Sequence, residues 1–94
     1  MNINYSILPE HMQDGMRRWI EHGIPAGSFM MSVLCNDLIG ALGRADSINI
    51  ERLRSYGTFL YSEAPSECHG SPEKVAAWEK RGGLRGHDKD QQAA

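Results

Sequence analysis

The segment Ser32–Asn49, SVLCNDLIGALGRADSIN, decides how the rest of the chain is interpreted. We expect a helix that begins at Ser28, a preferred N-cap residue, runs to about Leu42 and stops at Gly43. Its apolar residues cover a broader surface than one face of a solvent-exposed helix requires: Met30, Val33, Leu34, Leu38, Ala41 and Leu42. The segment therefore predicts the central helix of the fold.

Small side chains recur along one face of this predicted helix. They are Ser32, Asn36, Gly40 and Gly43, at i, i+4, i+8 and i+11. A glycine inside a helix costs about 1 kcal/mol, so the stripe needs some compensation. One interpretation is a close crossing with another helix or with a second subunit. The other is a recess with a glycine floor and the Asn36 amide at its rim, and both hold if the recess lies between subunits.

Polar side chains gather where this helix ends and the next begins. They are Asn36, Asp37, Arg44, Asp46 and Asn49. Amide donors, carboxylate acceptors and one guanidinium suit a polar molecule such as a nucleobase, a sugar or a phosphate. The structural alternative is that Asp46 caps the next helix, while Asp37 and Arg44 pair with one another or face water.

Two Gly-Ser pairs open predicted helices, with Ser28 and Ser71 at the cap positions. Exposed amide hydrogens at a helix start attract anions, so we add both residues to the candidate ligand site. The alternative for each is plain helix capping. Neither surrounding sequence, PAGS or CHGS, has the spacing of a phosphate-binding loop.

Periodicity predicts three more helices, over residues 9–22, 46–62 and 72–81. The first ends at Gly23, and the last begins with Pro72 after the Ser71 cap. Residues 56–61, YGTFLY, also fit a short strand. The predicted fold is all-α, a small bundle of three to four helices with the second helix central.

A chain of 94 residues makes one domain. We expect an N-terminal arm over residues 1–8, extended against the core or a second subunit, a single helical domain over 9–84, and a mobile polar tail over 85–94. The broad second helix, together with methionines expected to be exposed, predicts a homo-oligomer. These methionines are Met12, Met16, Met30 and Met31.

Composition excludes several classes of protein. The formal net charge of −2 supplies no general attraction for nucleic acid. No apolar run reaches the length of about 18 residues that crosses a membrane, and the opening residues do not resemble a secretory signal. Two cysteines, Cys35 and Cys68, do not make a disulfide framework, so the cytoplasm is the expected compartment.

Catalytic and metal-binding patterns are also missing from the sequence. Its histidines and cysteines show no CxxC, HxxxH or HExxH spacing, so we predict neither a metal nor a cofactor. Cys68 precedes His69, but neighbours in sequence rarely face one another and no third group orients the base. We therefore expect no enzyme. A helix-turn-helix is disfavoured because the helix after GIPAGS begins with FMMSVLCNDL, which is too apolar for a major groove.

Several stretches resemble a family of small uncharacterised proteins encoded by tailed phages and prophages. They are GIPAGSF, then VLCNDLIGALGRAD followed by Asn49, then GSPEKVAAW and the closing RGGL, within residues 8–84. The resemblance implies a phage or prophage origin, and it carries over no catalytic or binding residue. Small phage proteins often act on the host by inhibiting an enzyme, blocking a defence complex or sequestering a nucleotide signal.

Three functional hypotheses follow. In the first, the chain is a non-enzymatic phage protein in the host cytoplasm that sequesters a small polar, nucleotide-like ligand to counter host defence. In the second, it is an inhibitor or adaptor that binds a host enzyme or defence complex. In the third, it is a small DNA-associated regulator, which predicts DNA binding that weakens with salt.

Overall fold

The computed structural model describes residues 2–86, and this part of the chain is helical, without a strand. The all-α prediction is confirmed, and the strand alternative for residues 56–61 is wrong. The elements are more numerous and shorter than the three to four helices predicted. In chain order they are the 3-10 turn η1 (Tyr5–Ile7), α1 (Glu10–His22), α2 (Ser28–Leu34), α3 (Leu38–Arg44), α4 (Ser47–Glu51), α5 (Leu53–Ser62), the 3-10 turn η2 (Ser66–Cys68) and α6 (Pro72–Arg81).

Helix α1 has the amphipathic pattern that its sequence predicts. Met16, Trp19 and Ile20 are buried at i, i+3 and i+4, and the opposite face is polar. Pro9 lies immediately before the first helical residue. Gly23 ends the helix with a φ of 67°, and its amide nitrogen donates to the Trp19 carbonyl oxygen at 2.9 Å. This end is therefore set by local sequence.

Helix α6 also matches its prediction at both ends. The Ser71 hydroxyl oxygen accepts a hydrogen bond from the Lys74 amide at 3.2 Å, and Pro72 is the first helical residue. Gly82 ends the helix with a φ of 83°. Ser71 is thus a helix cap, as its structural alternative proposed.

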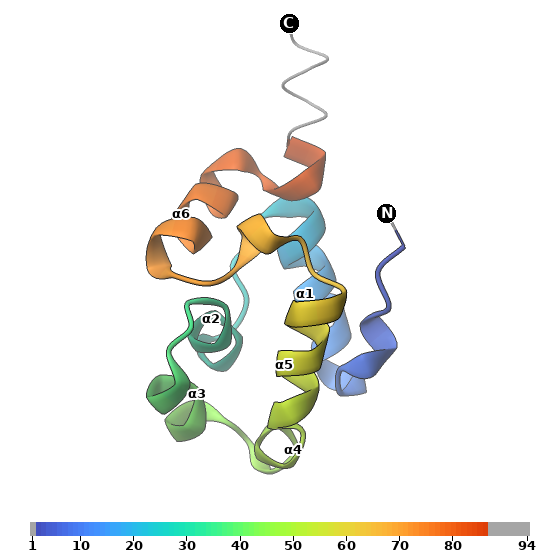
Figure 1. Ribbon diagram of the computed structural model, residues 1–94, viewed down its shortest axis with the longest axis vertical. Helices are drawn as coiled ribbons and strands as arrows, with labels where there is room; N and C mark the ends of the chain where they lie inside the picture. Colours follow the sequence, from blue (N-terminus) through green and yellow to red (C-terminus); the bar gives the residue numbers. More distant parts are fainter. Residues whose placement is uncertain (1, 87–94) are drawn as a thin grey trace, which may run out of the picture.

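The other two predicted helices are each divided. The predicted 28–42 helix is two helices, α2 and α3, which pack against one another. The predicted 46–62 helix is interrupted at Arg52, which separates α4 from α5 with a ψ of 15°. In Figure 1, α6 and the end of the described chain lie at one end of the molecule, α3 and α4 lie at the other, and α2 lies between α6 and α3.

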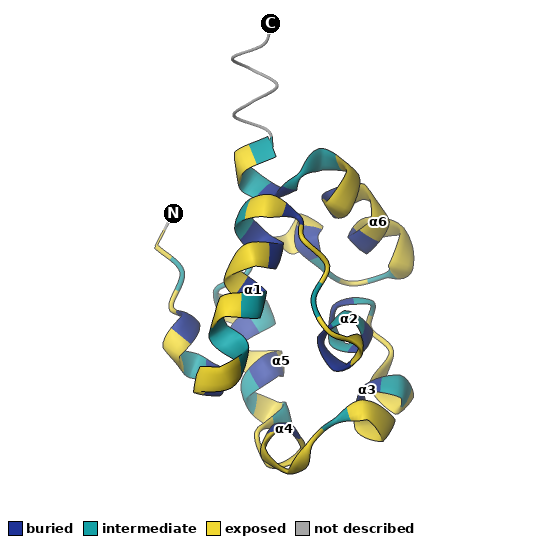
Figure 2. Ribbon diagram, turned by 180° about the vertical axis from the view of Figure 1, so that it is seen from behind, coloured by how far each residue is buried: buried dark blue, intermediate teal, exposed yellow. Residues whose placement is uncertain are grey.

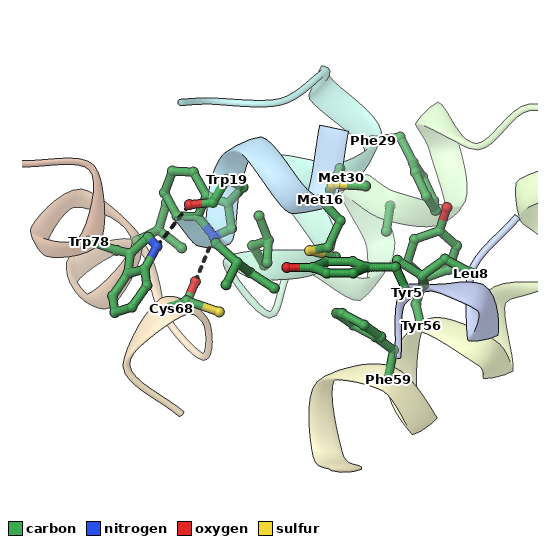
Figure 3. Packing of buried hydrophobic residues seen from close by; sticks show 14 residues of the cluster. Tyr5, Leu8, Met16, Trp19, Phe29, Met30, Tyr56, Phe59, Cys68 and Trp78 are labelled. Atoms are coloured by element: carbon green, nitrogen blue, oxygen red, sulfur yellow. Dashed lines mark hydrogen bonds between the residues drawn. The ribbon is translucent and has the colours of Figure 1, made fainter. Parts of the chain in front are cut away.

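The core forms around two tryptophans. Trp19 Nε1 donates to the Cys68 carbonyl oxygen at 3.0 Å, and Trp78 Nε1 donates to the Trp19 carbonyl oxygen at 2.9 Å (Figure 3). These two bonds join α1, η2 and α6 and satisfy both buried indole donors, which would otherwise be costly to bury.

Burial corrects the prediction of exposed methionines. Met16 and Met30 are both 0% exposed because they lie on the core faces of α1 and α2, and Met12 and Met31 are partly buried. A methionine-rich surface is therefore not available for self-association. Apart from Ile24, the exposed large aliphatic side chains of the described residues lie on α3 and α4, where Figure 2 shows mainly exposed residues.

The structure describes residues 2–8 of the predicted arm and residues 85–86 of the predicted tail. The arm packs against the core: η1 contacts α1 and α5, and Tyr5 and Leu8 are buried. At the other end, the Gly86 amide donates to the Gly82 carbonyl oxygen at 3.0 Å, so the first predicted tail residues continue a helical turn. The rest of the predicted tail, residues 87–94, lies outside the described residues. None of the described helices is long and apolar enough to cross a bilayer.

Candidate functional site

The break between α2 and α3 falls at Asn36, inside the segment that the sequence singled out. Asn36 has a φ of 64°, the one positive value among the described non-glycine residues. Its amide donates to the Val33 carbonyl oxygen at 3.1 Å, and the Asp37 amide donates to the Ser32 carbonyl oxygen at 2.8 Å. This pair of bonds around a left-handed residue is a Schellman cap. The continuous helix predicted over residues 28–42 is therefore wrong.

A new helix begins directly after this cap. The Asp37 carboxylate accepts from the Gly40 amide at 3.0 Å, as an N-cap does, and α3 follows. The predicted stripe is consequently divided, because Ser32 lies on α2, Asn36 lies in the break, and Gly40 and Gly43 lie on α3. Asn36 and Asp37, two polar residues inside the predicted helix, therefore end α2 and start α3.

Gly40 leaves room for two side chains that cross it. A Cβ at this position would collide with the Asp37 carboxylate and would lie 2.5 Å from Arg44 Nη1. The same Nη1 donates to the Ser32 hydroxyl oxygen at 3.2 Å. Arg44 therefore reaches back over Gly40 to α2 and does not form the ion pair with Asp37, while it stays exposed to water as the alternative interpretation predicted. Among the described residues nothing lies within 4 Å of a Cβ added to Gly43, so their packing does not require a glycine there.

Asp46 and Asn49 belong to a second polar group at the start of α4. Asp46 accepts from the Asn49 amide at 2.7 Å, so it is the N-cap, and it also pairs with His11 Nε2 at 3.1 Å. The bond from the Asn49 amide, followed by the one from His11, holds the pKa of Asp46 below its usual value. Asn49 is 2% exposed, and its Oδ1 accepts from the Tyr56 hydroxyl at 2.7 Å.

Ser28 and Ser71 differ in role. Gly27 is the N-cap of α2, so Ser28 is its first helical residue, and its side chain makes no capping bond. The predicted capping role of Ser28 is wrong. The start of α6 lies close to the α2–α3 break, because the Gly70 amide donates to the Leu34 carbonyl oxygen at 2.8 Å. Burial first, then the carboxylates of Asp37 and Glu73, raises the pKa of the Cys35 thiol in this corner.

An apolar groove opens beside the break, between α2 and α3 on one side and α5 on the other. We call it the α3 groove, and its volume is about 210 Å³. The residues that line it are Val33, Asn36, Asp37, Leu38, Ala41, Leu53, Tyr56, Gly57 and Leu60. Of the predicted site residues, this groove brings together Asn36 and Asp37. Asn49 contributes indirectly, because it holds the hydroxyl of Tyr56.

Sequence reasoning missed the α5 side of this groove and the apolar surface beside it. This side is formed by Leu53 and by Tyr56, Gly57 and Leu60, and the last three lie in the segment that also fits a short strand. On α3, Leu38 is 61% exposed and Ile39 is 77% exposed, and Leu42, Ile48 and Ile50 are also exposed. The predicted second helix has more apolar residues than one buried face requires, and this excess is the sequence feature that indicates an exposed apolar surface.

Nucleophilic and metal chemistry find little support in the described residues. The Cys68 thiol is buried, and burial raises its pKa to about 12, so it is not a thiolate at neutral pH. Within residues 2–86, no three His, Cys, Asp or Glu side chains are grouped so that they would hold a metal ion. The α3 groove can therefore contact a ligand through its apolar walls and through a few hydrogen-bonding side chains.

Comparison with known proteins identifies no relative. No protein-family model, no curated protein sequence and no solved structure gives a significant match to the chain.

Proposed function

We propose that this chain is a non-enzymatic binding protein that sequesters a small polar, nucleotide-like ligand, and that the α3 groove holds the base of that ligand. The supporting observation is the composition of the groove, which has apolar walls and the Asn36 and Asp37 side chains at its edge. Small-molecule sites are commonly apolar hollows with a few placed polar groups. A planar heterocycle needs apolar contact for its faces and hydrogen bonds for its edge.

Asn36 suits this role for two reasons. Its side-chain amide both donates and accepts hydrogen bonds, as the edge of a nucleobase does. Its left-handed backbone conformation is fixed by the cap between α2 and α3. Asp37 adds a carboxylate acceptor, of which Oδ1 is already bonded to the Gly40 amide. The remaining oxygen is the group that we assign to the ligand.

The biological setting of the proposal rests on the resemblance of GIPAGSF, VLCNDLIGALGRAD and GSPEKVAAW to small phage and prophage proteins. In that setting the protein would act in the host cytoplasm and counter host defence by withholding a nucleotide signal. Sequestration requires binding of this signal without turnover.

We also propose that the protein is a homo-oligomer that associates through α3 and α4. Five large aliphatic side chains on α3 and α4 are exposed: Leu38, Ile39, Leu42, Ile48 and Ile50. Monomeric soluble proteins rarely expose large contiguous apolar patches. Leu38 also lines the α3 groove, so association through this surface would place the ligand at or near a subunit interface.

The ligand proposal is tested with two variants and a control. Asn36→Gly removes the amide but keeps a residue that tolerates the left-handed cap. Gly57→Val adds a branched side chain to a residue that lines the groove, and among the described residues nothing lies within 4 Å of an added Cβ there. Thr58→Val, at the neighbouring exposed position on α5, is the matched control. Binding is measured by calorimetry with nucleotides, cyclic nucleotides and nucleotide sugars.

We expect the wild type and Thr58→Val to bind one of these ligands, and both groove variants to lose binding while they keep their helical circular dichroism. Wild-type protein that binds none of the three ligand classes contradicts the proposal, as does Gly57→Val that binds like the wild type. Native mass spectrometry of the purified protein reports the number of subunits and any retained ligand in one measurement.

A second candidate function is supported by the same exposed aliphatic side chains. In it, Ile39 and its neighbours bind an apolar helix face of a host enzyme or defence complex, as an inhibitor or adaptor would. Ile39→Asp separates the candidates. It should abolish a stoichiometric complex with such a host protein, and it should leave the groove of each subunit unchanged because Ile39 does not line it; native mass spectrometry of the variant reports whether the subunits also separate. A complex that survives Ile39→Asp argues against this candidate.

A further inference from the structure

A second hollow, which we call the arm cleft, lies between the N-terminal arm, α1 and the turn that follows α6. Its volume is about 710 Å³, and the groups that matter here belong to Asn2, Tyr5, Arg17, Glu21 and Arg85. The arm runs beside α1 in both ribbon views, and η1 contacts α1 (Figures 1 and 2). None of the residues that line the arm cleft lines the α3 groove.

Arg17 is held in place on the wall of the cleft. Its guanidinium carbon lies 4.8 Å from the centre of the Tyr5 ring, which is the geometry of a cation–π contact. Arg17 Nε lies 3.9 Å from a Glu21 carboxylate oxygen, and Nη1 lies 3.7 Å from Asp14. These distances are longer than hydrogen bonds, so the carboxylates orient Arg17 without saturating its five N–H donors.

Glu21 is shared with a second guanidinium. Arg85 Nη2 lies 3.4 Å from the other Glu21 carboxylate oxygen. Two guanidiniums and one carboxylate, +2 and −1, leave the cleft with a formal charge of +1. Asp14 does not line it, and its side chain is 82% exposed. Burial first, then the Glu21 carboxylate, raises the pKa of Tyr5 to about 12, so its hydroxyl is neutral and able to donate a hydrogen bond.

The geometry points to the arm cleft as a binding site for a small organic oxyanion, a phosphate monoester or a carboxylate. Guanidinium groups bind both kinds of anion through two parallel hydrogen bonds, and Arg17 is already oriented by the Tyr5 ring beneath it. The Asn2 amide adds a further donor, and Ile3 and Leu84 give the organic part of the ligand an apolar surface. The site is separate from the α3 groove and does not depend on the function proposed for it.

The test uses three probes: inorganic phosphate, phenyl phosphate and benzoate. Binding is followed by two-dimensional NMR of the full chain, through the amide signals of residues 2–5, of Arg17 and Glu21 and of Arg85. We expect saturable shifts of these signals, and tighter binding of phenyl phosphate than of inorganic phosphate because the ring contacts Ile3 and Leu84. Whether phenyl phosphate or benzoate binds more tightly identifies the oxyanion.

Arg85→Gln is the critical variant, because Arg85 is exposed and its loss should leave the fold intact. Loss of one charged hydrogen-bonding group should weaken binding on the order of tenfold. Arg54→Gln, an exposed arginine on α5 outside the cleft, is the matched control and should bind like the wild type. Absence of saturable shifts at millimolar probe overturns the proposal, and so does equal weakening by Arg85→Gln and Arg54→Gln.

Discussion

The backbone of Gly83 lies directly against that of Gly23, so that a Cβ added to Gly83 would come within 2.6 Å of the Gly23 amide nitrogen. Both residues have left-handed backbones, with φ values of 69° and 67°. The turn after α6 is thereby packed onto the turn after α1. The RGGL motif owes its second glycine to this contact, since neither a side chain nor another backbone conformation fits there.

Gly83→Ala should therefore lower the free energy of unfolding by about 2 kcal/mol or more, since it adds both a backbone clash and a strained φ. Gly15→Ala is the matched control, because Gly15 lies inside α1 with nothing within 4 Å of an added Cβ. It should stabilise the protein by roughly 0.5–1 kcal/mol. Urea unfolding, followed by the fluorescence of the buried Trp19 and Trp78, measures the free energy of unfolding of both variants. Equal effects of the two variants would refute the contact.

The cap at Asn36 predicts opposite behaviour for two small replacements. Asn36→Ala should cost about 1 kcal/mol, because alanine resists the left-handed conformation. Asn36→Gly should be neutral or stabilising, because glycine adopts that conformation freely. Thermal unfolding of both variants measures the difference. If alanine is tolerated as well as glycine, α2 continues through Asn36 and the division from α3 is incorrect.

The bond between Tyr56 and Asn49 makes a prediction about stability. Tyr56→Phe keeps the ring, which packs edge-on against Phe29 at 5.2 Å, but leaves the buried Asn49 Oδ1 without its partner. The free energy of unfolding should fall by about 1–3 kcal/mol, the cost of an unsatisfied buried polar group. Tyr61→Phe, at a position that is 93% exposed, should change it by less than about 0.5 kcal/mol. Chemical denaturation measures both changes. An unchanged free energy of unfolding in Tyr56→Phe would show that the bond does not stabilise the fold.

His69 predicts how stability depends on pH. Burial first, then the Lys74 ammonium, lowers the pKa of His69 from its ordinary 6.5. The unfolded chain thus takes up a proton more readily than the folded one. The stability contributed by neutral His69 is complete above pH 6.5 and is lost as the pH falls through the lowered pKa. His69→Gln should reduce the fall in melting temperature between about pH 7.5 and pH 5. Carboxylates titrate little in this range.

The exposed His22, near the end of α1, provides the control for this experiment. His22→Gln removes one histidine and leaves the half-buried His69 imidazole in place. The slope of stability against pH should persist in this variant. A slope that vanishes in both variants, or in neither, would assign the effect to groups other than His69.

The sequence by itself determined the helical class and those helix ends that local chemistry fixes. Asp46 and Ser71 are caps because a short polar side chain satisfies exposed amides at the helix start, and Gly23 ends α1 because it adopts a left-handed backbone. These interactions span a few residues and are readable without knowledge of the fold. The sequence also drew attention to Asn36 and Asp37, which line the α3 groove.

At Asn36 two local signals conflict, and the tertiary structure decided that the helix ends there: Asn36 and Asp37 can end one helix and cap the next, but the apolar pattern continues. The apolar period of 3.6 residues runs through it from Val33 to Ala41, so periodicity favoured one long helix. Dividing the helix lets α3 fold back on α2, which buries Ala41 and leaves Leu38 and Ile39 in solvent. The far wall of the groove comes from α5, across long-range contacts that no local pattern encodes. Side-chain packing between distant segments therefore set both the groove and the exposed apolar surface, because burial depends on what the rest of the chain covers.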